Sequence, residues 1–193
     1  MVLTRVSIPL LALVLFVAGC GGERGVDWAA PQNLVLWEHT SETDQGVQIQ
    51  YGSLVDAPAQ AVYEALADVD HYPDFIPGVS YVQVLMVSEN SKTVQIAQQV
   101  ISRQTNAKVE WKFYPEQRRI EFRTIQSNLS LNDGSYEVEA SPDGRRCFVK
   151  TTFLVRAGPG GGSVPAGVLA SATREAFLSA AEGVRRRATG QAR

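Results

Sequence analysis

The sequence predicts an α+β fold in which a curved antiparallel sheet of six to seven strands wraps around one long C-terminal helix, with two short helices after the first strands. Three observations support this. Most segments after residue 33 alternate apolar and polar residues, which is typical of strands with one buried face. Helices do not alternate with these strands, so a parallel sheet is not expected. The last long segment is amphipathic, and the sheet is its only large partner.

The first two strands are expected to form a hairpin. Residues 34–40 are a possible first strand, and a turn follows at 44–46. Val47, Ile49 and Tyr51 then alternate with polar neighbours. Two such runs joined by a short turn that contains glycine are typical of a β-hairpin.

The hydrophobic period then changes to that of a helix. Asp56 is a suitable N-cap, and Val62, Leu66 and Val69 recur at helical spacing after it. A second short helix is expected over residues 71–76, because a proline and a glycine follow it directly.

The clearest strand signal lies in the middle of the chain. Val109, Trp111 and Phe113 alternate with charged residues, and Ile120 and Phe122 do so after a turn. One apolar and one charged face indicate an antiparallel sheet with one side in water. Further strands are expected over residues 79–88 and 93–103, around residue 136 and over 148–155.

The final helix is expected over residues 165–188. Its apolar face includes Phe177 and Val184, and many of its other residues are small. Three arginines stand in its last turn, where cations interact favourably with the helix dipole.

Composition excludes several classes of function. The 193 residues carry a formal net charge of −2, so nucleic-acid binding is not favoured. Two cysteines and two histidines are too few for a disulfide-dense scaffold or a zinc finger. We therefore predict no metal site and no cofactor. Cys147 is expected to be a small buried residue of a strand.

The first residues have the pattern of an export signal. Arg5 precedes the apolar run 6–19, which is shorter than the roughly 20 residues that a membrane-spanning helix needs. The run ends in Val17-Ala18-Gly19-Cys20. This sequence resembles the bacterial lipobox, whose cysteine is acylated and becomes the mature N-terminus. The resemblance implies that Cys20 is lipidated and can be labelled with palmitate.

We therefore expect three parts: a lipoprotein signal peptide over 1–19, a tether over 20–32 and one folded domain over 33–193. The implied location is the bacterial cell envelope, with the protein lipid-anchored to a membrane. The glycine after Cys20 is similar to that of lipoproteins sorted to the outer membrane, where the domain faces the periplasm.

Residues 63–79, YEALADVDHYPDFIPGV, carry the most specific motif of the chain. Their tyrosine-proline and phenylalanine-x-proline spacing resembles the START-like superfamily, also called Bet v 1-like or SRPBCC. Gly134-Ser135-Tyr136 is similar to its glycine-x-aromatic strand, and Val164-Pro165 to the start of its final helix. The most similar subgroup is the bacterial polyketide cyclase/dehydrase and coenzyme Q-binding START-like proteins. The resemblance spans about residues 47–189 and implies a helix-grip fold.

A helix-grip fold implies a hydrophobic cavity between sheet and helix, because small helical residues leave space that aromatic strand residues line. The candidate cavity residues are Trp111, Phe113, Phe122, Tyr136, Phe75, Leu169, Ala172 and Ala176. Gln98, Thr124 and Gln126 have the strand parity to face inward and orient a ligand's carbonyl or hydroxyl, and the alternative is that they face solvent.

The favoured function is a membrane-anchored, non-catalytic carrier or chaperone that binds a lipid, a quinone or an isoprenoid-like molecule. No catalytic residue is predicted. One alternative is an aromatase/cyclase acting on a polyketide-like substrate, in which Asp68, His71 and Tyr72 supply acid–base groups. The structural interpretation of this cluster is a solvated helix junction. The other alternative is an envelope interaction protein with a solid interior and no ligand.

Overall fold

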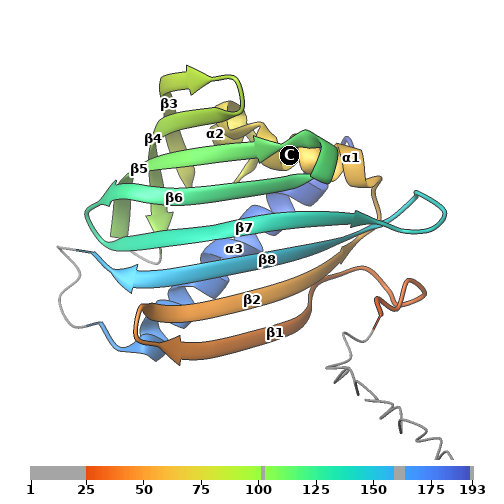
Figure 1. The fold of residues 1–193 in the computed structure, drawn as a ribbon, viewed down its shortest axis with the longest axis horizontal. Helices are drawn as coiled ribbons and strands as arrows, with labels where there is room; N and C mark the ends of the chain where they lie inside the picture. Colours follow the sequence, from red (N-terminus) through yellow and green to blue (C-terminus); the bar gives the residue numbers. More distant parts are fainter. Residues whose placement is uncertain (1–24, 101–102, 159–163, 192–193) are drawn as a thin grey trace, which may run out of the picture.

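One antiparallel sheet of eight strands forms most of the protein (Figure 1). The computed structural model describes residues 25–100, 103–158 and 164–191. The strands are β1 (Asn33–Thr43), β2 (Gly46–Val55), β3 (Val79–Ser88), β4 (Ser91–Val100), β5 (Arg103–Tyr114), β6 (Arg119–Ser127), β7 (Ser130–Ala140) and β8 (Cys147–Ala157). The helices are α1 (Ala59–Ala67), α2 (Tyr72–Phe75) and α3 (Ala166–Ala188), with 3-10 turns η1 (Val69–His71) and η2 (Pro115–Gln117).

The fold class is the predicted one, but the sheet has eight strands rather than six or seven. Every strand coincides with a segment of the sequence that alternates. The segments around Ile120 and Tyr136 show only brief alternation, yet they extend to strands of 9 and 11 residues. Both complete the ladder between β5 and β8.

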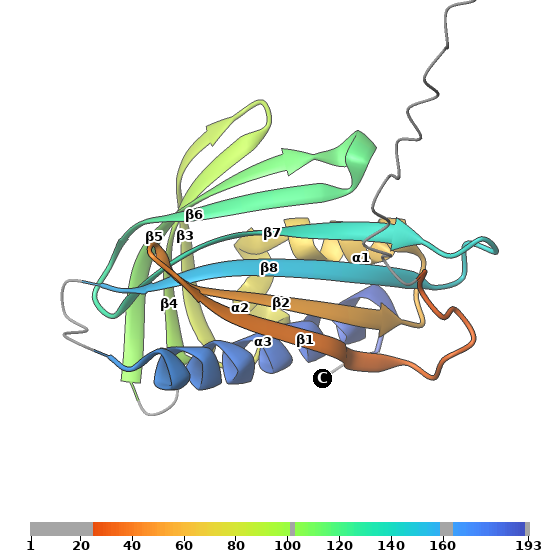
Figure 2. The ribbon, with the colours of Figure 1, turned by 60° about the horizontal axis from the view of Figure 1, so that its bottom comes forward.

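The sheet order is β1-β2-β8-β7-β6-β5-β4-β3. Strands that follow one another in the chain are neighbours, except for β2 and β3: β2 pairs with β8, and β3 forms the opposite edge of the sheet. Figure 2 shows the result: the sheet curls around α3, with β1 and β3 as its two free edges. This curvature forms the concave face on which the core and the cavity lie.

Helix α3 packs along the concave face, and its observed start at Ala166 is one residue from the predicted one. The rings of Phe177 and Tyr51 stack at a centroid distance of 4.1 Å and join helix and sheet. At its other end Gly183 allows close approach to α2, since a Cβ built there lies 2.4 Å from the Phe75 carbonyl oxygen. Within the described residues, no helix is both long and apolar enough to cross a membrane.

The predicted helix and strand faces are buried. Val62, Leu66 and Val69 lie in the core beside α3 and the sheet. Cys147 is buried in β8, and its burial raises the pKa of the thiol to about 12. A thiol of this kind stays protonated and unreactive at neutral pH.

Residues 25–32 lie against the domain before β1 begins. Arg146 donates hydrogen bonds from Nη1 to the carbonyl oxygens of Trp28 and Ala30, and the Asp56 backbone N–H donates to Oε1 of Gln32 at 3.0 Å. The expected signal peptide over 1–19 and the lipidated Cys20 lie outside the described residues.

Candidate ligand-binding cavity

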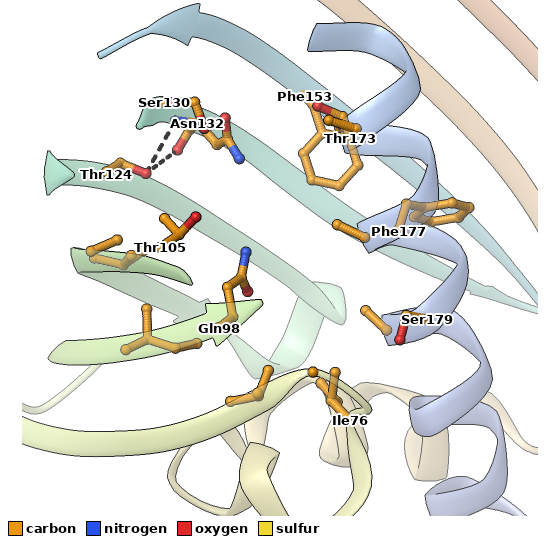
Figure 3. Close-up of a pocket in the computed structure, with 18 of the residues that line it drawn as sticks. Ile76, Gln98, Thr105, Thr124, Ser130, Asn132, Phe153, Thr173, Phe177 and Ser179 are labelled. Carbon is orange, nitrogen blue, oxygen red and sulfur yellow. Dashed lines mark hydrogen bonds between the residues drawn. The ribbon is translucent and has the colours of Figure 1, made fainter. Parts of the chain in front are cut away.

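A cavity of about 450 Å³ lies between the N-terminal half of α3 and strands β4 to β8, with the turn from α2 to β3 on one side (Figure 3). This volume falls in the range of small-molecule sites. The sheet contributes Ile96, Gln98, Gln99, Thr105, Ala107, Val109, Trp111, Phe122, Thr124, Ser130, Asn132, Tyr136, Phe153 and Val155. Tyr72, Ile76, Pro77, Gly78, Val79 and the α3 residues Leu169, Ala172, Thr173, Glu175, Ala176, Phe177, Ser179 and Ala180 complete the lining.

The small residues of α3 explain why the space is not filled. Ala172, Ala176 and Ala180 recur every four residues, so they share one face of the helix, and all three line the cavity. A methyl group is too short to reach the opposite wall of a concave sheet. The spacing therefore leaves a hollow where larger side chains would make a solid core.

The deeper wall is a continuous cluster of aromatic rings. Phe122 lies at its centre, with ring centroids 5.2 Å from Trp111, 5.4 Å from Tyr136 and 5.7 Å from Phe153. Phe153 in turn meets Phe177 edge-on at 6.2 Å. Rings held by several neighbours have few alternative rotamers, so this wall is a preorganised apolar surface.

Polar side chains from four strands occupy the other part of the lining. Figure 3 shows Gln98, Thr105, Thr124 and Asn132 gathered on the sheet side, facing α3. The Thr124 hydroxyl donates to the Asn132 carbonyl oxygen at 2.8 Å and accepts from its backbone N–H at 3.1 Å. These two hydrogen bonds hold the backbone of β7 beside β6, and they do not involve the Asn132 side chain.

The titratable groups of the lining are two tyrosines and a glutamate. Burial raises the pKa of Tyr136 and raises that of Tyr72 well above its ordinary value. Tyr72 also donates its hydroxyl proton to the Leu66 carbonyl oxygen at 2.6 Å. Glu175 is exposed at the rim. Because both phenols stay protonated at neutral pH, they are hydrogen-bond donors and not bases.

Six of the eight candidate residues line the cavity: Trp111, Phe122, Tyr136, Leu169, Ala172 and Ala176. Phe113 and Phe75 do not. Phe113 lies on the same face of β5 as Trp111 but two residues farther along the strand. There it pairs with Ile120 of β6 and packs against the core. Phe75 is buried edge-on to Tyr72 and beneath the Arg187 guanidinium, because α2 presents Tyr72 to the cavity instead.

Two of the three polar candidates also reach the cavity. Gln98 and Thr124 line it, whereas Gln126 is exposed on β6. The register between β5 and β6 shifts by one residue, since Val109 pairs with Thr124 but Lys108 with Gln126. This bulge at Ile125 reverses the strand parity, so Ser127 is buried in place of Gln126.

Sequence reasoning missed several lining residues, including Thr105, Ser130 and Asn132. All three carried a signal, and Thr105 has the strand parity of Trp111 in β5. Asn132 and Ser130 share the strand parity of Tyr136, so its inward position also places them inside. The turn over residues 76–79 carried no comparable signal, because turn residues have no periodic pattern.

The acidic cluster before α2 lies at the surface as a junction of ion pairs. Asp68 accepts hydrogen bonds from His71 Nδ1 at 2.5 Å and from Arg187 at 3.0 Å, and Lys92 binds Asp70 at 2.7 Å. The hydrogen bond to Asp68 raises the pKa of His71. None of these five residues lines the cavity, whereas Tyr72 does. Among the described residues, no cluster of histidine, cysteine or acidic side chains could hold a metal ion.

A curved antiparallel sheet that grips one long helix around an apolar cavity defines the helix-grip class of folds. The chain belongs to the polyketide cyclase / dehydrase and lipid transport family, whose sequence profile matches residues 55–182. This confirms the resemblance predicted from residues 63–79 and the strand around Tyr136. Among curated proteins, none matches the chain.

Solved structures of bacterial proteins share the fold. The Zhui aromatase/cyclase of Streptomyces sp. R1128 is 20% identical, with a TM-score of 0.65 over 80% of this chain and 97% of that one. A START superfamily protein of Mycobacterium smegmatis is 12% identical, with a TM-score of 0.65 over 74% and 97%. A STAR-related lipid transfer protein of Xanthomonas axonopodis is 14% identical, with a TM-score of 0.59 over 79% and 92%.

Proposed function

We propose that this protein is a lipid-anchored carrier of the bacterial cell envelope whose cavity binds a hydrophobic small molecule. The lipid anchor is Cys20, and the ligand is a lipid, a quinone or an isoprenoid-like compound. The anchor keeps the cavity near the membrane in which such ligands dissolve. On a membrane facing the periplasm, the domain would extract a ligand, shield it from water and deliver it.

The cavity of about 450 Å³ with its aromatic wall is the observation that supports binding most strongly. Each buried methylene group of a ligand contributes about 0.8 kcal/mol in favour of transfer from water. Because the rings of the wall are already ordered, little conformational entropy is lost when the ligand enters. An empty apolar cavity of this kind destabilises the folded protein, and a bound ligand removes this cost.

The chemistry of the lining favours binding over catalysis. General acid–base catalysis needs a group whose pKa lies near the working pH, and both lining tyrosines titrate far above it. His71, whose pKa is raised by its hydrogen bond to Asp68, is exposed and is not among the lining residues. An aromatase/cyclase activity is the alternative that the likeness to the Zhui enzyme keeps open. This alternative predicts that the protein cyclises a polyketide chain and that the variant Tyr136→Phe loses this activity.

Bound small molecules provide the first test. The full chain is purified from a bacterial host, analysed by native mass spectrometry, and extracted with organic solvent. We expect one apolar molecule per protein. The variant Ala172→Leu/Ala176→Leu, which fills the cavity from α3, should contain none. An extract that is empty for the wild type, or equal for both proteins, contradicts the carrier function.

The anchor is tested separately. Cells expressing the full chain are labelled with radioactive palmitate, and the protein is followed through membrane fractionation. We expect label in the wild type and none in Cys20→Ala, together with loss of Cys20→Ala from the membrane fraction. Label in both proteins, or in neither, contradicts acylation of Cys20.

A further inference from the structure

The described lining of the cavity carries almost no charge. Its one carboxyl group belongs to Glu175, which is exposed at the rim on α3. No lysine, arginine or histidine is among the described lining residues. A carboxylate or phosphate taken into this space would lose its water shell without gaining a cation, which opposes binding.

The polar residues are placed to surround one end of a ligand. Figure 3 shows the side chains of Gln98 and Asn132 entering the same space from β4 and β7, with Thr105 between them. Phe153 and Phe177 lie across from Asn132, on the side of α3. Amide groups offer both donors and acceptors, so this end suits hydroxyl and carbonyl oxygens without any net charge.

We propose that the cavity selects an uncharged amphiphile and rejects anionic lipids such as fatty acids. Its hydroxyl and carbonyl oxygens bind the side-chain amides of Asn132 and Gln98, and its apolar body lies on the aromatic wall. This inference rests on the proposed binding function and narrows its ligand class.

A matched pair of probes tests the charge preference. In the full chain Trp28 and Trp37 are replaced by phenylalanine, so that Trp111 is the one remaining tryptophan. Its fluorescence is followed while 1-palmitoylglycerol or palmitate is added at pH 7.5. Both probes have the same acyl tail, but only the first has an uncharged head with carbonyl and hydroxyl groups. We expect 1-palmitoylglycerol to bind at least tenfold more tightly.

Two variants locate the head group. Asn132→Leu keeps the hydrogen bonds to Thr124, because these use only the Asn132 backbone. It should weaken the binding of 1-palmitoylglycerol about five- to tenfold, the usual effect of one lost hydrogen bond. Gln98→Leu, on a different strand, should act in the same direction. Palmitate affinity should not fall in either variant. Gln126→Leu, outside the cavity, is the control and should change neither affinity.

The outcomes separate this proposal from the binding function. Equal or tighter binding of palmitate overturns the charge preference and leaves the carrier function intact. Unchanged binding of 1-palmitoylglycerol to both Asn132→Leu and Gln98→Leu overturns the placement of the head group. If neither probe binds and the organic extract is empty, both the proposal and the carrier function are wrong.

Discussion

Filling the cavity from the helix should stabilise the ligand-free protein. Ala176 lines the hollow, so Ala176→Leu adds three carbon atoms to a space of about 450 Å³. At about 0.8 kcal/mol for each buried methylene, their transfer contributes about 2.4 kcal/mol. Restricting the leucine side chain costs about 0.5–1 kcal/mol, and helix propensity changes little. We expect a net gain of about 1–2 kcal/mol.

A buried alanine outside the cavity is the matched control. Ala59 on α1 is 4% exposed and packed in the core, so Ala59→Leu has no hollow to enter. Overpacking of this kind destabilises by about 1–3 kcal/mol. The assay is equilibrium urea unfolding of the full chain, followed by tryptophan fluorescence and by circular dichroism, after bound lipid has been removed. The two leucine variants should therefore move the midpoint in opposite directions.

The result that would refute this reasoning is a loss of stability in Ala176→Leu as large as that in Ala59→Leu. It would mean that side chains already fill the space beside α3. The carrier function would then lose its physical basis, and the alternative of an envelope interaction protein with a solid interior would be favoured.

Three further predictions concern the parts of the fold around the cavity. Phe177→Ala should cost about 3–5 kcal/mol in urea unfolding, because this ring is buried against Tyr51. Gly183→Ala should destabilise despite the better helix propensity of alanine, since its Cβ meets the Phe75 carbonyl oxygen at 2.4 Å. Gly167→Ala, with nothing within 4 Å, should instead stabilise by up to about 1 kcal/mol in the same assay. Asp68 raises the pKa of His71 in the folded protein, so the protonated imidazole stabilises the fold. This stabilisation is complete below about pH 6.5, the usual pKa of histidine in an unfolded chain. It is lost as the pH rises through the higher pKa of the folded state. Urea midpoints between pH 5 and 9 should show this decline in the wild type and not in His71→Gln, and identical slopes would contradict the role of the Asp68 pair.

Regular periodicity made the main elements predictable. The final helix was expected over residues 165–188 and is observed over Ala166–Ala188, because its apolar stripe and flanking proline are local signals. The aromatic wall was found in part for the same reason. Trp111 and Phe122 lie in strands where every second residue is charged, and this pattern predicts which face of the strand is buried.

The polar part of the cavity was harder to predict, because it depends on how strands pair. A single bulge at Ile125 turns Gln126 outward, and no residue type in β6 indicates that a bulge occurs there. Phe75 was assigned to the cavity as part of a motif, but its ring in the short α2 lies beneath Arg187 and edge-on to Tyr72. Such positions follow from tertiary packing, which local sequence patterns do not encode.

A titration with a neutral apolar fluorophore tests the central claim most directly. N-phenyl-1-naphthylamine is added to the full chain and to Ala172→Leu/Ala176→Leu, and energy transfer from Trp111 is measured in the background without Trp28 and Trp37. The account predicts saturable transfer at one site in the wild type and its loss in the double variant. Absence of saturable transfer in the wild type, or the same binding curve for both proteins, would contradict an apolar cavity between sheet and helix.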